Sequence, residues 1–489
     1  MPLRPYDQEQ TFLLPPSLNE WVRRDHPARV FSELIDRIDT GIFRDVKAEG
    51  RPAYHPKMML KVLLWGYATG VRSSRKIEER LQQDVAFMWL AGMERPDFRT
   101  LCLFRTGNKE AMEQVFTEVI TIARAMGMGN LGLVALDGSK VQANSGIESF
   151  KSVGQWRNKL QEAREEAQRI IDEAERIDRE ENACYGEAAR GDELPAGLEK
   201  AAARIKKIEE LLEHARQAGR EEKAKMSLSD PEASFMHKRT TSIPAYNAQL
   251  AVTEDHLIIH ADVTTEPVDV NQVKSAVEGI EREVGELPAV LAADAGYCGG
   301  ENLKHLEDKG IDAYIPEQGE RQIGKEKRAR PHLYGKASFA YDGAAERYIC
   351  PQGQEMRPAA TARVTGPYHK RKVTVYRTKR GVCAQCTRRQ QCTDDNKLGR
   401  SISRDGYEGY RDRMRAKLIT EQGKALYGKR KCIVEPVIGQ IKTRGRFSQF
   451  LLRGVQKVRI EWKIGAIAHN LLKIAGTVVK REREIPACA

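Results

Sequence analysis

The 489-residue sequence contains no run of eighteen or more apolar residues, so it offers no obvious membrane-spanning helix. Its first ten residues, MPLRPYDQEQ, lack the basic and apolar regions of a secretory signal. The lysine-containing, Gly-rich loop that cradles ATP phosphates is also absent, which argues against an ATP-driven enzyme. These absences predict a cytoplasmic protein without a membrane partner.

The composition is that of an ordinary globular protein. With 40% hydrophobic and 31% charged residues, the chain can bury several cores, and its length predicts two to four domains. The formal net charge is +12 at pH 7. An excess of positive charge raises encounter rates with phosphate backbones, so it favours nucleic acid as a partner. Many basic proteins bind no nucleic acid, and charge alone therefore decides nothing.

The nine cysteines are unevenly spaced, and four of them cluster. Cys383 and Cys386 have the spacing that lets two thiolates share one tetrahedral zinc ion, and Cys350 with Cys392 would complete the set. In a reducing compartment such a cluster favours a structural Zn²⁺ site over disulfides. The alternative is a set of buried or free thiols, because the flanking pair is irregularly spaced.

Residues 1–125 are predicted to form a helical N-terminal domain. Apolar residues recur at helical spacing after Ser74, which is suited to begin a helix, and the segment before it reads as an apolar helix ending near Gly70. Short helices of this kind suit either a DNA-binding bundle or a plain packing domain. We expect this domain to bind the ends of a DNA element, for the reason given below.

Residues 126–150, 240–320 and 420–480 are predicted to form one α/β core. Apolar strands are expected near 131–138, as a hairpin across 245–264, before Asp294, and near 310–316, with a helix over 270–283 between them. After 420 the pattern is helical again. Strands mixed with helices in this way indicate a mixed sheet covered by helices.

Two insertions interrupt this core. In residues 151–239, apolar residues seven apart run along two segments on either side of a Gly- and Pro-containing break, which predicts an antiparallel coiled-coil hairpin. This arm would grip DNA or a second subunit, or it is a solvated decoration. Residues 321–419 form a basic insertion that carries the clustered cysteines.

Three carboxylates draw attention within the core. Asp137 and Asp294 are each predicted to end a buried strand, and Glu435 lies in a helical segment two turns before Lys442. Asp137-Gly138 is also the strongest short signal for a tight hairpin turn, so it has a purely structural explanation. Three such acids would suit two divalent cations, which activate a water or 3′-hydroxyl and neutralise the leaving oxygen at phosphorus.

The sequence around these acids resembles the motifs of one protein family. ALDGSKVQANSG, AADAGYCGGENLKHL and VEPVIGQIKTRGRF are similar, in this order, to the three acid blocks of the DDE transposases of bacterial insertion sequences. The segments GRPAYHPKMMLKVLLWGYATGVRSSRKIEE and AFMWLAG resemble the helical region before that core. The resemblance spans about residues 50–475, and three ordered blocks are far more specific than one.

The resemblance implies a ribonuclease-H-like mixed-sheet core with the helical N-terminal domain, the coiled-coil hairpin and the cysteine-bearing insertion attached. It implies Asp137, Asp294 and Glu435 as catalytic ligands of Mg²⁺ or Mn²⁺, and Lys442 as a contact to the DNA backbone. Tyr427 and Arg430 match the Tyr and Arg of the family's Tyr-Arg-Glu-Lys signature, and both are expected to bind DNA. Arg430 lies one residue further from Glu435 than usual, so Lys431 is an alternative basic partner.

The implied function is binding of terminal inverted repeats, followed by DNA strand cleavage and strand transfer. The expected partner is double-stranded DNA, both transposon ends and target, bound by a homodimer in a bacterial cytoplasm. A related nuclease without strand transfer and a catalytically dead DNA-binding repressor are the alternatives. His256 and His260 lie four residues apart but lack a zinc-protease pattern, so they are interpreted as surface or core histidines.

Overall fold

The structure is a computed structural model that describes residues 17–43, 53–185, 197–238, 241–317, 334–366, 369–393, 395 and 399–484. The chain divides into two compact units. The first comprises Met1–Asp269, Ser275–Pro288 and Arg430–Ala489, and the second comprises Val270–Lys274 and Ala289–Lys429.

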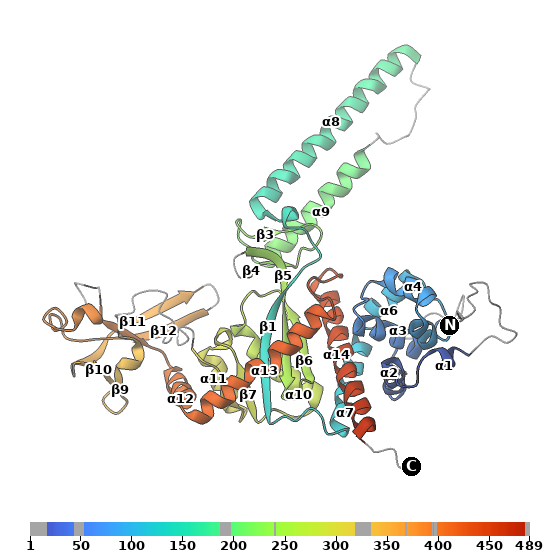
Figure 1. The fold of residues 1–489 in the computed structure, drawn as a ribbon. Coiled ribbons are helices and arrows are strands. Elements are labelled where there is room, and N and C mark those ends of the chain that lie inside the picture. Colours follow the sequence, from blue (N-terminus) through green and yellow to red (C-terminus); the bar gives the residue numbers. More distant parts are fainter. Residues whose placement is uncertain are drawn as a thin grey trace, which may run out of the picture. The chain divides into compact units, whose positions relative to one another are not determined.

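The first unit begins with a group of short helices, as the sequence predicts (Figure 1). The helix over Pro56–Ala68 is capped by His55, whose ring accepts a hydrogen bond from the Lys57 N–H, and it has Pro56 where a missing N–H costs nothing. It ends before Gly70, which adopts a positive φ of 77°. The helices are α1 (Leu18–Trp21), α2 (Pro27–Asp36), α3 (Pro56–Ala68), α4 (Ser74–Gln83), α5 (Val85–Ala91), α6 (Phe98–Gly107) and α7 (Lys109–Ala125).

Antiparallel strands follow in the same unit. The predicted hairpin is confirmed, and its first strand also pairs with the strand that carries Asp137. The strands are β1 (Leu133–Gln142), β4 (Ser234–Lys238), β5 (Thr241–Thr253) and β6 (Ile258–Thr264), and β5 pairs with each of the other three.

Two long C-terminal helices, α13 (Glu421–Thr443) and α14 (Val455–Glu484), confirm the helical pattern predicted after residue 420. α14 contacts α3, α7 and β6, and it is buried over most of its length. Its fully buried Trp462 donates a hydrogen bond from Nε1 to the Gln249 carbonyl at 3.1 Å. This contact fixes α14 against the strand next to β1.

The second unit contains a parallel pair and a separate antiparallel sheet. β7 (Val290–Ala293) runs parallel to β8 (Asp312–Tyr314), and both are predicted strands. With the antiparallel pairing of β1, β4, β5 and β6, the fold is mixed α/β, which fits the expected ribonuclease-H-like core. The second unit also contains the helices α11 (Gly300–Asp308) and α12 (Glu408–Leu418), whereas the predicted helix α10 (Val273–Val284) lies mostly in the first unit.

The cysteine-bearing region folds as a sheet that the sequence did not predict. Its strand order is β13-β12-β11-β10-β9, with antiparallel neighbours throughout. A small core of aromatic and aliphatic side chains lies against it. The strands are β9 (Ala340–Asp342), β10 (Arg347–Ile349), β11 (Glu355–Gly366), β12 (His369–Arg377) and β13 (Ser401–Arg404).

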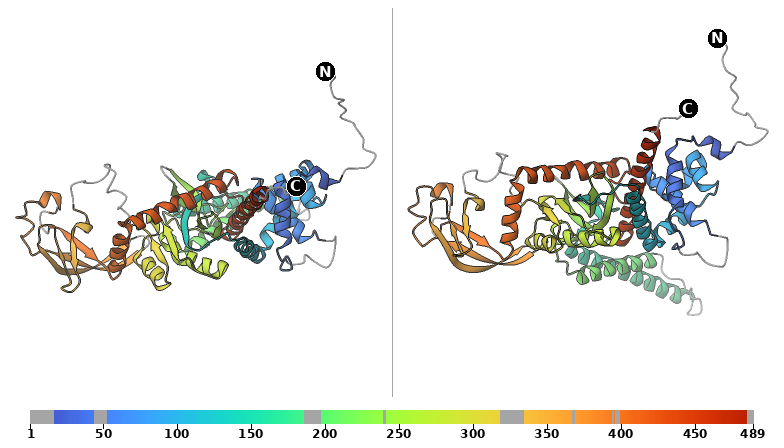
Figure 2. Two further views of the ribbon diagram at one scale, coloured as in Figure 1. Left: turned by 60° about the horizontal axis from the view of Figure 1, so that its bottom comes forward. Right: turned by 90° about the horizontal axis from the view of Figure 1, so that it is seen from below.

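Two long helices lie in residues 151–239, where the sequence contains heptads. α8 (Val153–Tyr185) and α9 (Leu198–Gln217) lie side by side in Figures 1 and 2, and ion pairs Arg164–Glu209 and Arg204–Glu166 cross between them in antiparallel register. We call this pair of helices the arm.

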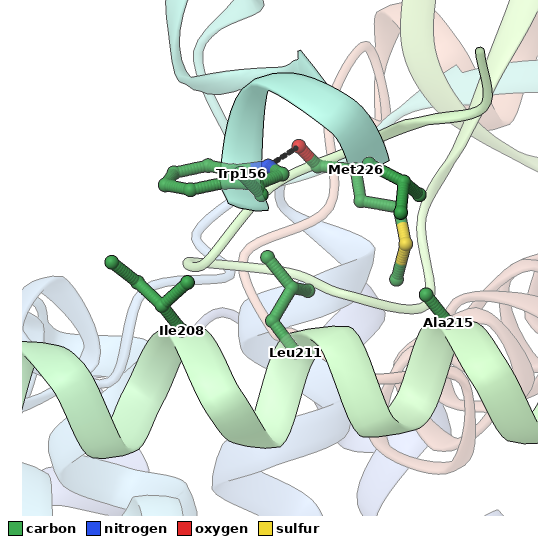
Figure 3. Packing of buried hydrophobic residues seen from close by; sticks show 6 residues of the cluster. Trp156, Ile208, Leu211, Ala215 and Met226 are labelled. Atoms are coloured by element: carbon green, nitrogen blue, oxygen red, sulfur yellow. Dashed lines mark hydrogen bonds between the residues drawn. The ribbon is translucent and has the colours of Figure 1, made fainter. Parts of the chain in front are cut away.

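The seam of the arm is best packed at its base. Trp156 lies over Ile208 and Leu211 of α9, and its Nε1 donates to the Met226 carbonyl at 2.9 Å (Figure 3). The short strands β2 (Lys151–Ser152) and β3 (Lys225–Met226) pair next to this cluster. Further out, Ile177 is 42% exposed. The base therefore anchors the arm, and its outer part is open to solvent.

Candidate active site

Asp137 lies in the middle of β1 and does not end it. The strand continues to Gln142, and Asp137 is paired with Leu250 of β5. The prediction of a strand end is wrong, and so is the alternative of a hairpin turn at Asp137-Gly138. Local turn propensity is overridden because the residues after Gly138 find antiparallel partners along the long β5 strand.

Gly138 is explained by close packing. A Cβ at this position would lie 2.7 Å from Asp269 Oδ1 and 3.0 Å from Asn247 Oδ1, and it would also collide with Gln249 Nε2. Asp269 accepts hydrogen bonds from both amides, Asn247 at 2.7 Å and Gln249 at 3.0 Å. The face of β1 opposite Asp137 is therefore filled by a polar cluster that leaves no room for a side chain.

A single guanidinium connects two of the candidate acids. Arg430 Nη1 lies 2.9 Å from Asp137 Oδ2, and Nη2 lies 3.9 Å from Glu435 Oε1. The Arg430 side chain is only 4% exposed, so this charge is held away from water between the carboxylates. Asp137 and Glu435, far apart in sequence, thus meet within the first unit.

α13 presents Glu435 and Lys442 on one side, seven residues and about two turns apart. The Lys442 ammonium donates to Ser139 Oγ, and Ser139 follows Asp137 by two residues on the same face of β1. The Glu435 side chain is 57% exposed. α13 therefore brings one acid and one cation to the strand that carries Asp137, and leaves the acid accessible.

The signature residue Tyr427 and the alternative basic partner Lys431 also lie on α13. Tyr427 is half-buried, three residues before Arg430, whereas Lys431 is exposed. The sequence left open whether Arg430 or Lys431 is the basic partner. Of the two, it is Arg430 whose side chain contacts Asp137 and approaches Glu435.

Asp294 belongs to the second unit. It directly follows the buried strand β7, as predicted, and its Oδ1 accepts a hydrogen bond from the Gly296 N–H at 2.7 Å. This bond caps the short helix η3 (Ala295–Tyr297). Asp294 as a whole is half-buried at the end of the strand.

Two protein-family models match the chain. One, a transposase DDE domain, matches residues 349–475, and the other, a transposase domain (DUF772), matches residues 16–107. Together they indicate an insertion-sequence DDE transposase. No curated protein matches the chain.

The DDE match covers part of the transposase site. It includes Glu435 and Lys442, and it also includes strands β11, β12 and β13 of the cysteine-bearing sheet. Asp137 and Asp294 lie before it, so their assignment rests on the sequence blocks. The DUF772 match falls on the helices before β1. Within the part of the chain that the structure describes, no helix is both long and apolar enough to cross a membrane.

DDE transposases normally use divalent metals. Among the described residues of this transposase, no three His, Cys, Asp or Glu side chains are arranged to hold a metal ion. In the first unit, however, Asp137 and Glu435 offer hard oxygen donors on either side of a positive charge supplied by Arg430. This donor chemistry fits a magnesium or manganese ion.

The four clustered cysteines line one small pocket of the second unit. The Cys350 sulfur accepts N–H contacts from Gln352 at 3.4 Å and Gln354 at 3.3 Å. Burial raises the pKa of the Cys392 thiol, and the charges of the other three cysteines act in the same direction. All four are free thiols. The predicted four thus line one pocket, although they are not arranged as a metal-holding group, and zinc binding by them stays a prediction.

One buried ionic cluster in the transposase was not predicted. His260 is 3% exposed and its Nδ1 lies 2.9 Å from Glu283 Oε2, while Lys463 Nζ lies 2.5 Å from Glu283 Oε1. Burial alone would raise the pKa of Glu283, but His260 and Lys463 hold it down to about 2. The interpretation of His260 as a core histidine is confirmed. Its partner was invisible in the sequence because α10 carries it onto β6 only in the folded chain.

Proposed function

We propose that this transposase binds the terminal inverted repeats of its own element and catalyses two-metal DNA strand cleavage followed by strand transfer. The observation that carries the proposal is the Arg430 guanidinium held between the Asp137 and Glu435 carboxylates. The two acids come from the first and third of the three sequence blocks. A helix packed on a strand for stability alone needs no acids at this point.

In this proposal Asp137, Asp294 and Glu435 hold the divalent cations, Mg²⁺ or Mn²⁺. Bound there, the cations would activate a water or 3′-hydroxyl and neutralise the leaving oxygen of an in-line displacement at phosphorus. The β1–β5 register fixes the position of Asp137. Arg430 offsets the mutual repulsion of the carboxylates in the absence of metal, and so keeps Asp137 and Glu435 close before DNA arrives.

Lys442 is proposed to contact a DNA phosphate near the reacting bond. Its ammonium lies beside Ser139, two residues from Asp137, and a lysine at that place would neutralise backbone charge. The exposed Lys431 and the half-buried Tyr427 are proposed as further backbone contacts on the same helix. Arg430 is proposed to contact DNA only if it leaves its carboxylate partners.

The helical N-terminal region, residues 1–125, is proposed to recognise transposon ends, because the DUF772 transposase match falls within it. Two ends have to be held together while strands are joined. We therefore propose a homodimer as the active species on double-stranded DNA, with both ends and the target bound.

The four-cysteine pocket is proposed to hold one structural Zn²⁺. Four thiols from loops that follow β10 and β12 line it, and thiolates are the ligands that structural zinc prefers. One equivalent of zinc in the purified protein, lost in a Cys383→Ser, Cys386→Ser variant, supports this. Absence of zinc in protein purified with zinc in the medium contradicts it.

The experiment uses purified protein and DNA carrying the repeats that flank its reading frame. Asp137→Asn, Asp294→Asn and Glu435→Gln should each lower Mg²⁺-dependent nicking at least a hundredfold and retain end binding, because each loses a proposed metal ligand. Glu421→Gln is the matched control, since Glu421 lies on the same helix with a 91% exposed side chain. It should nick like the parent chain.

The products separate the alternatives. Joining of pre-cut ends to target DNA supports a transposase, and hydrolysis without joined products supports the nuclease. End binding without any nicking by the parent chain supports the repressor. Unchanged nicking by any of the three acid variants would show that the site is wrongly assigned.

A further inference from the structure

α13 contains a proline directly after Glu435. Pro436 has no N–H, so the i to i−4 hydrogen bond that would end on the Cys432 carbonyl is missing. That carbonyl lies three residues before Glu435, less than one helical turn away. The helix is therefore deprived of an internal bond at the turn that carries the candidate acid.

Another part of the chain supplies this bond. His256 Nε2 lies 3.0 Å from the Cys432 carbonyl oxygen. Because a carbonyl only accepts, Nε2 is the protonated nitrogen of the imidazole. Nδ1 then faces Lys473 Nζ at 3.5 Å with its lone pair. The ring thus takes the place of the N–H that Pro436 lacks.

The turn that carries His256 is itself firmly held. His256 adopts a left-handed φ of 66° between β5 and β6, and its carbonyl accepts a hydrogen bond from His469 Nε2 of α14 at 3.1 Å. The neighbouring Asp255 accepts from the Gly129 N–H at 2.7 Å. The imidazole therefore projects from a turn that is held on two sides, so it can hold the Cys432 carbonyl in a fixed position.

We propose that His256 is a positioning residue for Glu435: it holds the proline-interrupted turn of α13 at a set distance from the sheet. The proposal rests on the assigned role of Glu435 in cleavage. In this proposal, His256 itself contacts neither Glu435 nor any reacting atom. Its bond to Cys432 is accessible to solvent, so water can satisfy the carbonyl when the ring is removed. What is lost is the fixed position of the acid, more than the stability of the fold.

The test is a double-mutant cycle on nicking of transposon-end DNA. His256→Asn keeps a residue that tolerates left-handed φ but is too short to reach Cys432. We expect the Mg²⁺ concentration for half-maximal nicking to rise about five- to tenfold, roughly the worth of one hydrogen bond, with the thermal midpoint little changed. Pro436→Ala restores an N–H to the helix and, in the His256→Asn background, should return the Mg²⁺ requirement to within about twofold of the parent chain.

The outcomes separate this inference from the proposed function. If Glu435→Gln abolishes nicking but His256→Asn leaves the Mg²⁺ requirement unchanged, only the positioning role is wrong. If His256→Asn raises the requirement and Pro436→Ala fails to restore it, the effect does not act through Cys432, and the inference is also wrong. If Glu435→Gln nicks normally, the site assignment fails first.

Discussion

At the scale of one residue, Gly138 shows how the face of β1 opposite Asp137 is packed. The three side chains that a Cβ would meet are bonded to one another through Asp269, and Gln249 is 3% exposed. None of them can move outward without breaking a partly buried hydrogen bond. The position of Asp137 in β1 therefore depends on its neighbour Gly138, which has no side chain.

Gly138→Ala is predicted to destabilise the protein by about 1–3 kcal/mol, the usual cost of forcing atoms into a packed site. Urea denaturation of the purified variant measures it. Gly146→Ala is the matched control, because nothing lies within 4 Å of a Cβ built there. Equal midpoints for the two variants would show that the cluster yields easily.

His469 makes a second prediction at this scale, about pH. Burial lowers its pKa to about 4, and the neighbouring Lys473 and Arg444 cations act in the same direction. The ring is therefore neutral in the folded protein, whereas in the unfolded chain it gains a proton below its ordinary pKa of 6.5. Its contribution to stability is complete above pH 6.5 and is lost as the pH falls toward 4.

The matched variant is His469→Gln, whose amide can still donate to the His256 carbonyl but does not titrate. Between pH 6.5 and 4 the free energy of unfolding of the parent chain should fall more steeply than that of the variant, by up to about 1.4 kcal/mol per pH unit. Denaturant titrations at several pH values measure both. Parallel curves would mean that His469 is protonated in the folded state.

At the residue scale, the candidate site residues could be predicted only from the short sequence motifs around them. Asp294 was recognised at the end of its strand from a short apolar run followed by an acid. Asp137 was recognised as a candidate, but the Asp-Gly pair suggested a turn, since a local pattern cannot reveal the long partner strand β5. Arg430 matched a signature residue, yet its contacts could not be predicted because they require α13 to cross β1.

Among the elements, the arm was predicted best and the cysteine-bearing sheet worst. Heptads report helix pairing directly, because the seam is written into each helix. The strands β9, β10 and β13 have three, three and four residues, too short for alternation to show, and exposed basic side chains interrupt the pattern of β11 and β12. A sheet of this kind is defined by the pairing of its strands, and that pairing cannot be recognised in the sequence of any single segment.

The arm also yields a prediction, because its charge distinguishes the functions left open for it. Residues 153–217 contain twelve Lys and Arg against sixteen Asp and Glu, a net charge of −4 within a chain of +12. An acidic rod is repelled by phosphate, which disfavours a grip on DNA.

Replacing residues 169–201 by a short Gly-Ser linker keeps the base cluster of Trp156, Ile208 and Leu211. We predict that end-DNA affinity, measured by fluorescence anisotropy over a range of salt, stays within about twofold or tightens, because the segment removed is acidic. A tenfold loss of affinity with an unchanged thermal midpoint would show that the arm binds DNA after all.

Over the whole molecule, the basic residues are concentrated outside the arm. The residues other than 153–217 carry a net charge of +16. The two transposase matches also lie outside the arm, one before and one after it. In sequence, the two matched regions flank the arm. The acidic composition of the arm suits a protein partner, such as the second copy proposed above.

The central claim is that Asp137, Asp294 and Glu435 hold one pair of cations. Anomalous diffraction from crystals of the protein with transposon-end DNA and Mn²⁺ tests it most directly. The account predicts two manganese peaks about 3.5–4 Å apart, with all three carboxylates among their ligands. Manganese bound without one of these acids, or bound at another place in the chain, would contradict it.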